Sequence, residues 1–323
     1  MLDFFGSIGH AIMAPLYYAV SFILVGFHKG LSALGLDPAG GWTWILSIIG
    51  LTLVVRTALI PLFVKQIKSS RNMQLIQPKV RELQKKYGHD REKLAQETMK
   101  LYKDSGTNPF ASCLPILLQM PIFLALFRML DQAARKGKAH GFMDTELAGQ
   151  FRDAKFFGDI PVSGTLTGGV GGVVVVAAIL VVAMTATTFM TQRQLMSKNM
   201  PADALSGPYA QQQKLLLYVL PVVFAVGGIA FPIGVLVYWT ISNLWTMCQQ
   251  FYVIRNNPAP GTPAAKAKEE RDRHKAERHG LKTPAQVEEE RLAAEAESKR
   301  EEKAQARVQP QRQTKAQRNK KKR

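Results

Sequence analysis

The stretch Trp42–Val64, WTWILSIIGLTLVVRTALIPLFV, decides the fold class of this chain. About 20 apolar residues are what a helix needs to cross the hydrocarbon core of a bilayer, and only Arg56 interrupts this stretch with a charge. A charge at the centre of such a helix costs about 2.5–3.5 kcal/mol on insertion scales, so it normally faces protein or water rather than lipid. The stretch therefore predicts a membrane-spanning helix whose arginine has no acidic partner within the span.

The composition divides the 323 residues into apolar blocks and strongly charged ones. The mean hydropathy of −0.04 averages the two kinds, and the formal net charge is +18. The last apolar block, 215–254, is long enough for two crossings, and Gly227, Gly228, Pro232 and Gly234 in its middle predict a turn between them. We expect an all-α polytopic membrane protein with five transmembrane helices, a cytoplasmic helical hairpin and a basic, largely disordered C-terminal tail.

The positions of Lys and Arg predict the orientation. Positive residues gather on the cytoplasmic side of membrane proteins, which places the basic segments 65–108 and 255–323 inside and the N-terminus outside a bacterial cell membrane. Loop 131–167 also carries positive residues, a mild conflict with this topology. The expected segments are an outer-surface segment with an amphipathic helix (1–41), transmembrane helix 1 (42–64), the cytoplasmic hairpin (65–108), transmembrane helix 2 (109–130), an extracytoplasmic loop (131–167), transmembrane helix 3 (168–190), a cytoplasmic loop (191–214), transmembrane helices 4 and 5 (215–254) and the basic cytoplasmic tail (255–323).

Residues 11–28, AIMAPLYYAVSFILVGFH, admit three interpretations. Pro15 is suited to open a helix of about 14 residues, which is short for a crossing, so we favour a helix lying on the outer membrane surface. An uncleaved sixth span is the second interpretation. A signal sequence is the third, although no basic segment precedes the apolar run.

The segment 65–108 is predicted to form a helical hairpin. Gly88 is expected to end the first helix, Asp90 to cap the second and Gly106 to end it. A solvated spacer is the alternative, but a spacer needs no paired seam, so we favour an interaction role. The apolar seam of the first helix, spaced by three and four residues as in a coiled coil, consists of Met73, Ile76, Val80, Leu83 and Tyr87.

The tail after Asn257 is poor in aromatic residues and ends in the basic block QRQTKAQRNKKKR. Residues 285–306 are suited to a helix of mixed charge. Such tails bind polyanions by counterion release, without reading sequence. We favour contact with RNA, and an anchor on anionic lipid is the alternative.

Polar residues recur at matched depth in three of the expected spans. Arg56 lies about 13 Å along its helix from the cytoplasmic end, and Gln119 lies at about the same depth in the antiparallel second span. Thr52 is one turn from Arg56, and Trp239 and Asn243 repeat that spacing in the fifth span. We expect these five side chains to share a water-filled cavity in the cytoplasmic half. A snorkelling arginine with amides that hydrogen-bond between helices is the alternative.

Residues that carry enzymatic chemistry are not found inside the expected spans. Tyr238 and Ser242 flank the polar pair of the fifth span, but no span holds Asp, Glu or His, so we expect no metal site and no proton relay. Cys113 and Cys248 fall near the cytoplasmic ends of spans two and five, where a disulfide is not expected. The soluble segments carry no P-loop, HExxH or GxSxG motif. We therefore expect neither an enzyme nor a cofactor.

Four stretches of the apolar core carry the most specific signal. They are LTLVVRTALIPLFVKQ (51–66), MQLIQPKVRELQKKYG (73–88), LYKDSGTNPFASCLPILLQMPIFLALFRML (101–130) and PIGVLVYWTISNLWTMCQQ (232–250). Together they resemble the YidC/Oxa/Alb superfamily of membrane protein insertases, over about residues 15–256. The resemblance is to bacterial members of the short form, without the large periplasmic domain.

The resemblance implies a five-helix core with a hydrophilic groove that is open to the cytoplasm and to lipid but closed on the outer side. By matching positions, the groove arginine is Arg56, and Thr52, Gln119 and Trp239 correspond to polar or aromatic groove positions. Residues 11–28 match the family's amphipathic helix on the outer surface. The tail is the part to which the resemblance extends least.

The expected function is insertion and folding of nascent membrane proteins through this groove. The expected partners are those nascent proteins, the ribosome through rRNA contact with the tail and hairpin, and anionic lipids, with the Sec translocon as a further candidate. A small anion channel or transporter using the same cavity is the alternative, although no inverted repeat is evident. An RNA-binding membrane anchor explains the tail but not the matched depth of the polar residues.

Overall fold

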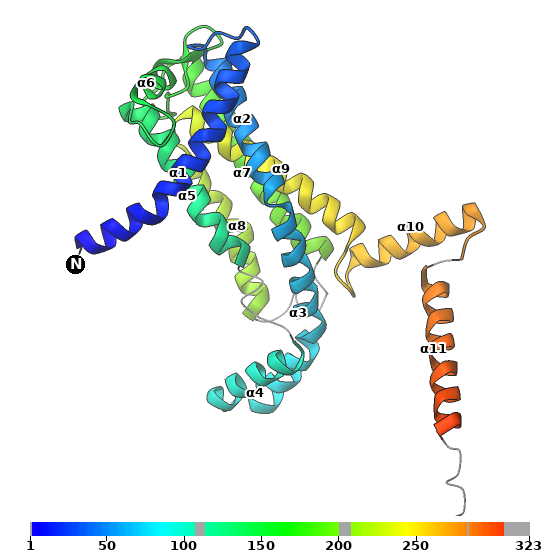
Figure 1. Cartoon of the computed structure of the whole chain (residues 1–323). Coiled ribbons are helices and arrows are strands. Elements are labelled where there is room, and N and C mark those ends of the chain that lie inside the picture. Colours follow the sequence, from blue (N-terminus) through cyan, green and yellow to red (C-terminus); the bar gives the residue numbers. More distant parts are fainter. Residues whose placement is uncertain (1, 107–113, 200–207, 283, 307–323) are drawn as a thin grey trace, which may run out of the picture. The chain divides into compact units, whose positions relative to one another are not determined.

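The computed structural model describes residues 2–106, 114–199, 208–282 and 284–306, and most of them are helical (Figure 1). The chain divides into two compact units, Met1–Ala265 and Lys266–Arg323. The expected all-α class is confirmed at this level. One short pair of strands is the exception, and the sequence did not indicate it.

Helix α1 (Leu2–Ala33) is a single 32-residue helix that contains Pro15. The expectation that Pro15 opens a short helix is therefore wrong. An internal proline removes one backbone hydrogen bond and usually bends the helix, and α1 changes direction along its length in Figure 1. Val20, Leu24 and Val25 of its second half are buried in the core, where α1 packs against α2 and α5.

Helices α2 (Gly41–Ala58) and α3 (Ile60–Tyr87) together contain the stretch that was expected to be one span. They meet at Leu59, which keeps helical dihedral angles, and Pro61 lies in the first turn of α3. Proline has no N–H group, so inside a helix it removes one hydrogen bond of the ladder. In the first turn of a helix the N–H groups have no partner within the helix, so proline is tolerated there. The break at Leu59 follows from that proline.

Helix α4 (Arg91–Asp104) completes the hairpin with α3. The Asp90 carboxylate accepts a hydrogen bond from the Lys93 amide at 3.0 Å, and Gly106 follows the helix with a φ of +61°, so the predicted cap and stop are confirmed. Gly88 is the C-cap of α3, as expected. Ile76 of the predicted seam is buried, and the side chain of Met73 lies outside the described part.

Helix α5 (Leu114–Lys136) leads into α6 (Thr145–Asp153), which Asp144 caps by accepting from the Leu147 amide at 2.8 Å. Strands β1 (Lys155–Phe156) and β2 (Ile160–Pro161) then form a two-residue antiparallel pair in which Phe156 faces Ile160. Gly234 lies against this part of the fold, because a Cβ atom there would come within 2.8 Å of the Phe151 ring.

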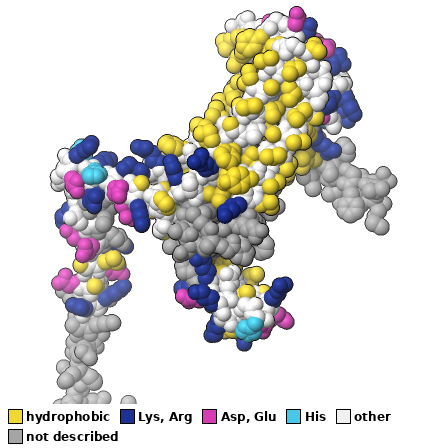
Figure 2. Space-filling model, turned by 180° about the vertical axis from the view of Figure 1, so that it is seen from behind, with side chains coloured by type: hydrophobic (Ala, Val, Ile, Leu, Met, Phe, Trp, Pro, Cys, Tyr) yellow, Lys and Arg dark blue, Asp and Glu magenta, His cyan; other side chains and the backbone are white. Residues whose placement is uncertain are grey.

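Three further helices complete the bundle: α7 (Gly172–Asn199), α8 (Pro208–Gly228) and α9 (Ile233–Asn256). Helix α9 contacts α7, α2 and α5, so it lies between the others. Within the described ranges, Gly41–Ala58 and Gly172–Lys198 are long and apolar enough to cross a membrane. Figure 2 shows one face of the bundle, on which hydrophobic side chains predominate, as expected of a surface that meets lipid.

The second unit contains α11 (Pro284–Ala306) and most of α10 (Pro263–His279). The tail is thus helical over most of its described length, whereas a largely disordered tail was expected. Its Ala, Glu, Lys, Arg and Gln residues are strong helix formers, which explains the difference. Residues 307–323, the last basic block, lie outside the described residues.

Candidate functional site

Arg56 in the last turn of α2 is joined to α9 through the hydroxyl of Ser242. The Arg56 Nε donates to Ser242 Oγ at 3.1 Å, and Nη2 donates to the same oxygen. Ser242 is buried and Arg56 is partly exposed. Among the described residues, Arg56 forms no ion pair with an Asp or Glu. The arginine therefore keeps its full charge, held in place by a neutral group.

Thr52 lies one turn before Arg56 on α2 and is almost fully buried. Its hydroxyl donates to the Ile48 carbonyl of the same helix at 2.7 Å. Tyr238, one turn before Ser242 on α9, is also buried. Polar groups thus flank the arginine on both helices, and the hydroxyl of Thr52 has oxygen lone pairs left to accept hydrogen bonds.

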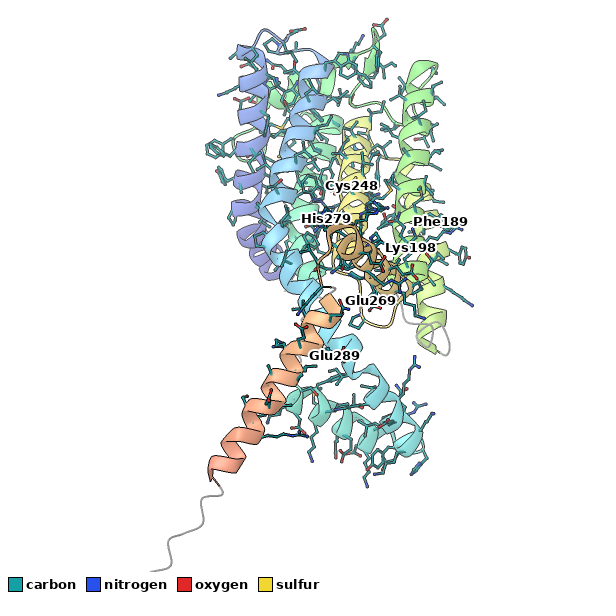
Figure 3. All side chains as sticks on the ribbon, turned by 90° about the vertical axis from the view of Figure 1, so that its right-hand side faces the viewer. Phe189, Lys198, Cys248, Glu269, His279 and Glu289 are labelled. Atoms are coloured by element: carbon teal, nitrogen blue, oxygen red, sulfur yellow. The ribbon has the colours of Figure 1, made fainter. Side chains whose placement is uncertain are left out.

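Asn243, the neighbour of Ser242, points to a different helix. Its Nδ2 donates to Thr188 Oγ1 at 2.9 Å, and the Met184 carbonyl is 3.4 Å away. Both partners belong to α7, on which Figure 3 labels Phe189, whereas Cys248 lies on α9. This contact is an interhelical hydrogen bond, the alternative role considered for the amides.

Trp239 lies within a cluster of aromatic rings. Its ring centroid is 5.0 Å from that of Phe123 on α5 and 4.9 Å from that of Phe224 on α8, both in edge-to-face geometry. Phe231, between α8 and α9, stacks on it at 5.7 Å. Aromatic rings at these separations and angles attract one another. Trp239 therefore holds α5, α8 and α9 together.

Gln119 on α5 has a buried amide oxygen that accepts no hydrogen bond from any described residue. Gln194 on α7 has the same feature. A buried acceptor without a partner costs free energy, so such a group normally meets water or a ligand. Gln119 was predicted from its depth, whereas Gln194 was not predicted.

The structure brings together part of the predicted constellation. It joins Arg56 to Ser242, which the sequence indicated only as a flanking residue, and directs Asn243 to Thr188, which was not predicted. The sequence of α7 does carry a signal, because four threonines close together are unusual in an apolar helix: Thr185, Thr187, Thr188 and Thr191. Within the described contacts, Thr52, Gln119, Trp239 and Asn243 form no hydrogen bond with Arg56.

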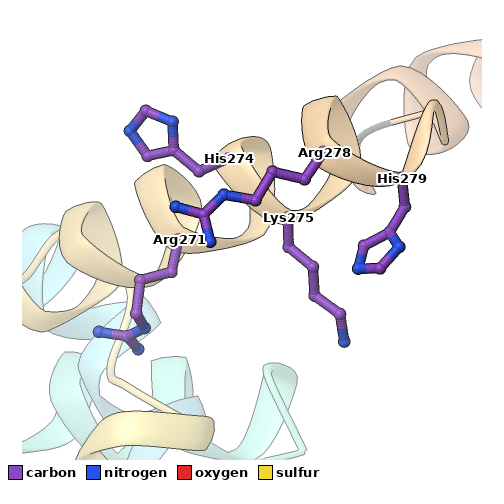
Figure 4. A pocket seen from close by; sticks show the side chains of 5 residues that line it. All are labelled: Arg271, His274, Lys275, Arg278 and His279. Carbon is purple, nitrogen blue, oxygen red and sulfur yellow. The ribbon is translucent and has the colours of Figure 1, made fainter.

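A second set of charged groups lies on α10 in the second unit. Five exposed basic or histidine side chains surround a surface pocket on this one helix, as Figure 4 shows. His274 Nδ1 lies 3.3 Å from a carboxylate oxygen of Glu277. Three of the five are Lys or Arg, and clustered cations of this kind favour polyanions. The pocket is lined by Arg271, His274, Lys275, Arg278 and His279.

The residues around Arg56 and the basic groups on α10 are both suited to binding charged groups by electrostatic attraction. The described residues hold no group of three or more His, Cys, Asp or Glu that is placed to bind a metal ion. Arg56 offers guanidinium N–H groups suited to a carboxylate, and α10 offers cations suited to phosphates.

Comparison with known proteins identifies relatives over the helical core. Residues 36–260 match the family "60Kd inner membrane protein". A membrane protein insertase YidC of Streptomyces avermitilis is 47% identical over 272 residues, which cover 81% of this chain and 62% of that protein. The chain thus spans less than two thirds of the length of that relative.

A second membrane protein insertase YidC, from Tropheryma whipplei, is 38% identical over 275 residues, which cover 80% of this chain and 89% of that protein. Among solved structures, a crystal structure of an active YidC insertase with its first transmembrane domain resolved matches with a TM-score of 0.45. The match has 23% sequence identity and covers 73% of this chain and 45% of that one.

Proposed function

The chain belongs to the 60Kd inner membrane protein family, and on that premise we propose that it inserts membrane proteins into the bilayer and helps them fold. The relatives reported above are named membrane protein insertases, which supports this function. The observation that carries the proposal is the setting of Arg56: a guanidinium in an apolar bundle, bonded to the Ser242 hydroxyl and without an acidic partner among the described residues.

The proposed site is a hydrophilic groove open to the cytoplasm. Arg56 supplies its charge, Thr52 and Gln119 supply hydrogen-bonding groups, and Trp239 and Asn243 border it on α9. The unsatisfied Gln119 oxygen supports a site that admits water or substrate, because buried acceptors are normally hydrogen-bonded. The Ser242 hydroxyl supports a fixed position for the guanidinium, since it holds Arg56 without neutralising it.

The proposed mechanism begins when a short hydrophilic end of a substrate enters the groove. Acidic residues in that end are drawn to Arg56, and the polar groups of the groove replace part of their hydration. The charged segment then has a shorter stretch of water-free hydrocarbon to cross. The substrate's apolar helix partitions into lipid beside the bundle and gains about 25 cal/mol for each Å² of apolar surface that leaves water.

The driving force requires no nucleotide and no covalent step. Transfer of the apolar helix into lipid is favourable by itself, and the membrane potential contributes about 2.3 kcal/mol per charge per 100 mV to the movement of an acidic tail outward. We therefore propose that the protein is not an enzyme and that its action uses no cofactor.

The proposed topology has five membrane-spanning helices, with the N-terminus outside and the C-terminus in the cytoplasm. The α3–α4 hairpin and the basic tail then face the ribosome, and the charge density on α10 supports contact with rRNA. Nascent membrane proteins are the proposed substrates, and anionic lipids and the Sec translocon are further proposed partners.

Reconstitution of the purified chain into liposomes tests the function. A fully synthesised substrate with one apolar helix and a short acidic tail is added from outside, and protection of the tail from protease is measured. We expect protection in liposomes that contain the chain and little in empty ones. Ion flux without tail protection would instead identify an anion channel.

A further inference from the structure

Trp42, the second residue of α2, stands at the end of a stripe of exposed apolar side chains. Trp42, Leu46 and Leu53 are 46%, 38% and 40% exposed. Their spacing of four and seven residues places them on one face of the helix. Because α2 is apolar enough to cross a membrane and the chain belongs to an inner membrane protein family, we expect lipid to cover this face, a step that rests on the proposed topology. Trp42 thus marks the level at which the lipid-facing stripe ends.

The β1–β2 hairpin extends the stripe beyond the helix with a second ring. Phe157, at the tip of the hairpin, is 67% exposed and meets Trp42 edge to face with ring centroids 4.7 Å apart. Phe156 is buried beneath them, 6.0 Å from the Trp42 ring. The hairpin lies so close to α2 that a Cβ atom on Gly41 would come within 2.6 Å of the Lys155 carbonyl carbon. The hairpin therefore holds the Phe157 ring at a fixed height.

The backbone of Phe157 has a φ of +47°, a conformation that bulky residues rarely adopt. Glycine takes this conformation without steric strain, and the next residue, Gly158, has a φ of +84°. The exposed ring of Phe157 contributes little to the core, so the fold alone does not explain an aromatic residue here. Strained positions of this kind are held by the surrounding structure and cluster at functional sites, so the strain at Phe157 points to a role for its ring.

We propose that Trp42 and Phe157 form an aromatic anchor in the headgroup region of the leaflet at this end of α2. Aromatic side chains concentrate at the interface between lipid and water, the level that the end of the stripe marks. Lys155 and Asp159 flank the tip, with their charged atoms 3.3 Å apart and their side chains 54% and 97% exposed, so this side of the hairpin stays in water. The anchor fixes the height and tilt of α2, and with it the depth of Arg56.

Spin labelling measures the depth of the hairpin tip directly. The full chain, with Cys113→Ser and Cys248→Ser, is labelled at Phe157→Cys and reconstituted in vesicles of phosphatidylethanolamine and phosphatidylglycerol. Relaxation of the label by oxygen is compared with relaxation by a water-soluble nickel complex. Asp159→Cys is the matched control in water, and Leu46→Cys is the control in hydrocarbon, which also reports correct folding.

The label at position 157 is expected to show a several-fold loss of nickel accessibility relative to position 159, and a depth between the two controls. Nickel accessibility at 157 equal to that at 159, with the label at position 46 still in hydrocarbon, would overturn the proposal. The two rings would then lie in water, where they could contact only a protein partner.

Native Trp42 provides a second measurement, without a label. Lipids that carry bromine near the headgroup end of the acyl chain quench tryptophan fluorescence at that depth. Trp42→Phe is expected to reduce this shallow quenching and to leave quenching by deeply placed bromine nearly unchanged. Shallow quenching that is the same with and without Trp42 would contradict the anchor, because the other three tryptophans would then account for all of it.

Discussion

The Arg56 guanidinium donates from Nε to the Ser242 hydroxyl over 3.1 Å, which joins two helices whose contacting residues lie 186 positions apart in the sequence. Serine is an acceptor without charge, so the arginine is oriented but not neutralised. The same contact fixes how far the charged group reaches along the bundle. The proposed insertion mechanism depends on this combination of fixed position and free charge.

Ser242→Ala removes the acceptor and leaves the rest of α9 unchanged. A hydrogen bond to a charged group contributes about 1.5–3 kcal/mol, so we expect roughly ten- to hundredfold slower insertion of an acidic-tailed substrate in liposomes. Ser242→Thr keeps the hydroxyl and should restore part of the rate. Equal rates for the parent and Ser242→Ala would show that the hydroxyl does not position the guanidinium.

The bond between Asn243 and Thr188 is expected to couple α9 to α7. A double-mutant cycle of Asn243→Ala and Thr188→Val, measured by unfolding in detergent, should give a coupling free energy of about 0.6 kcal/mol, the average for such bonds between membrane helices, and no more than about 1.7 kcal/mol. Thr187→Val is the matched control, because among the described residues its hydroxyl bonds to the Ala183 and Met184 carbonyls of its own helix. Coupling as large for Thr187 as for Thr188 would exclude a specific bond.

Water in the proposed groove is tested by the reactivity of Gln119→Cys, in a chain without Cys113 and Cys248. We expect a water-soluble maleimide added from the cytoplasmic side to modify it, because the amide oxygen it replaces has no hydrogen-bond partner in the described part of the chain. Met184→Cys is the control, since Met184 is fully buried in the bundle and should stay unmodified. The same assay applies to cysteines at positions 52 and 243. Modification only from the outer side would invert the proposed topology.

His140, in the loop between α5 and α6, is expected to make the docking of α1 sensitive to pH. Its Nε2 lies 2.8 Å from the Gln132 side-chain oxygen, and its ring centroid is 4.6 Å from that of Tyr17 on α1. Burial lowers the pKa of His140 below its usual value of 6.5, and the positive charges of Lys138 and Arg128 lower it further.

A lowered histidine pKa means that the folded state favours the neutral ring. This contribution to stability is present above pH 6.5 and is lost as the pH falls toward the lowered pKa. The thermal unfolding temperature of the parent should therefore drop more between pH 8 and pH 5 than that of His140→Gln. Identical pH dependence of the two proteins would assign the loss of stability to other groups.

Deletion of residues 262–323 removes the basic tail and none of the proposed groove residues. We expect weaker co-sedimentation with ribosomes, and binding by the intact chain should fall steeply with salt because counterion release drives it. Insertion of a fully synthesised substrate in liposomes should survive. Deletion of 284–323 alone is the matched control, since it keeps the α10 pocket. Equal co-sedimentation of intact and truncated chains at all salt concentrations would contradict ribosome binding by the tail and favour an anchor on anionic lipid.

Local signals in the sequence were sufficient for much of the fold. The apolar run around Arg56 predicted a membrane helix, and Asp90 and Gly106 marked the ends of α4, because caps and stops depend on residues within one turn. The prediction that Pro15 begins a helix was wrong, although proline favours the first turn of a helix. The packing of α1 on α2 and α5 outweighs the one hydrogen bond that Pro15 removes.

The hydrogen-bond partners of the polar side chains could not be predicted from the sequence. Depth along a helix follows from counting residues, but the direction in which a side chain points depends on how helices rotate against one another. Ser242 and Asn243 are neighbours in sequence, yet one turns to Arg56 and the other to Thr188. The β1–β2 pair is likewise too short for a periodic pattern to reveal.

Substitutions that change the charge at position 56 provide the most direct test of the proposed insertion mechanism. Insertion of two substrates that differ only in an acidic or a neutral translocated tail is measured in liposomes with the parent, Arg56→Ala, Arg56→Lys and Arg56→Glu. We predict that Arg56→Ala slows the acidic-tailed substrate about tenfold more than the neutral one, as expected for the loss of about 1.4 kcal/mol of favourable charge interaction. Arg56→Lys should retain part of the rate, because it keeps the charge but loses the guanidinium fork. Insertion of the acidic-tailed substrate by Arg56→Glu at the parental rate would contradict the electrostatic mechanism.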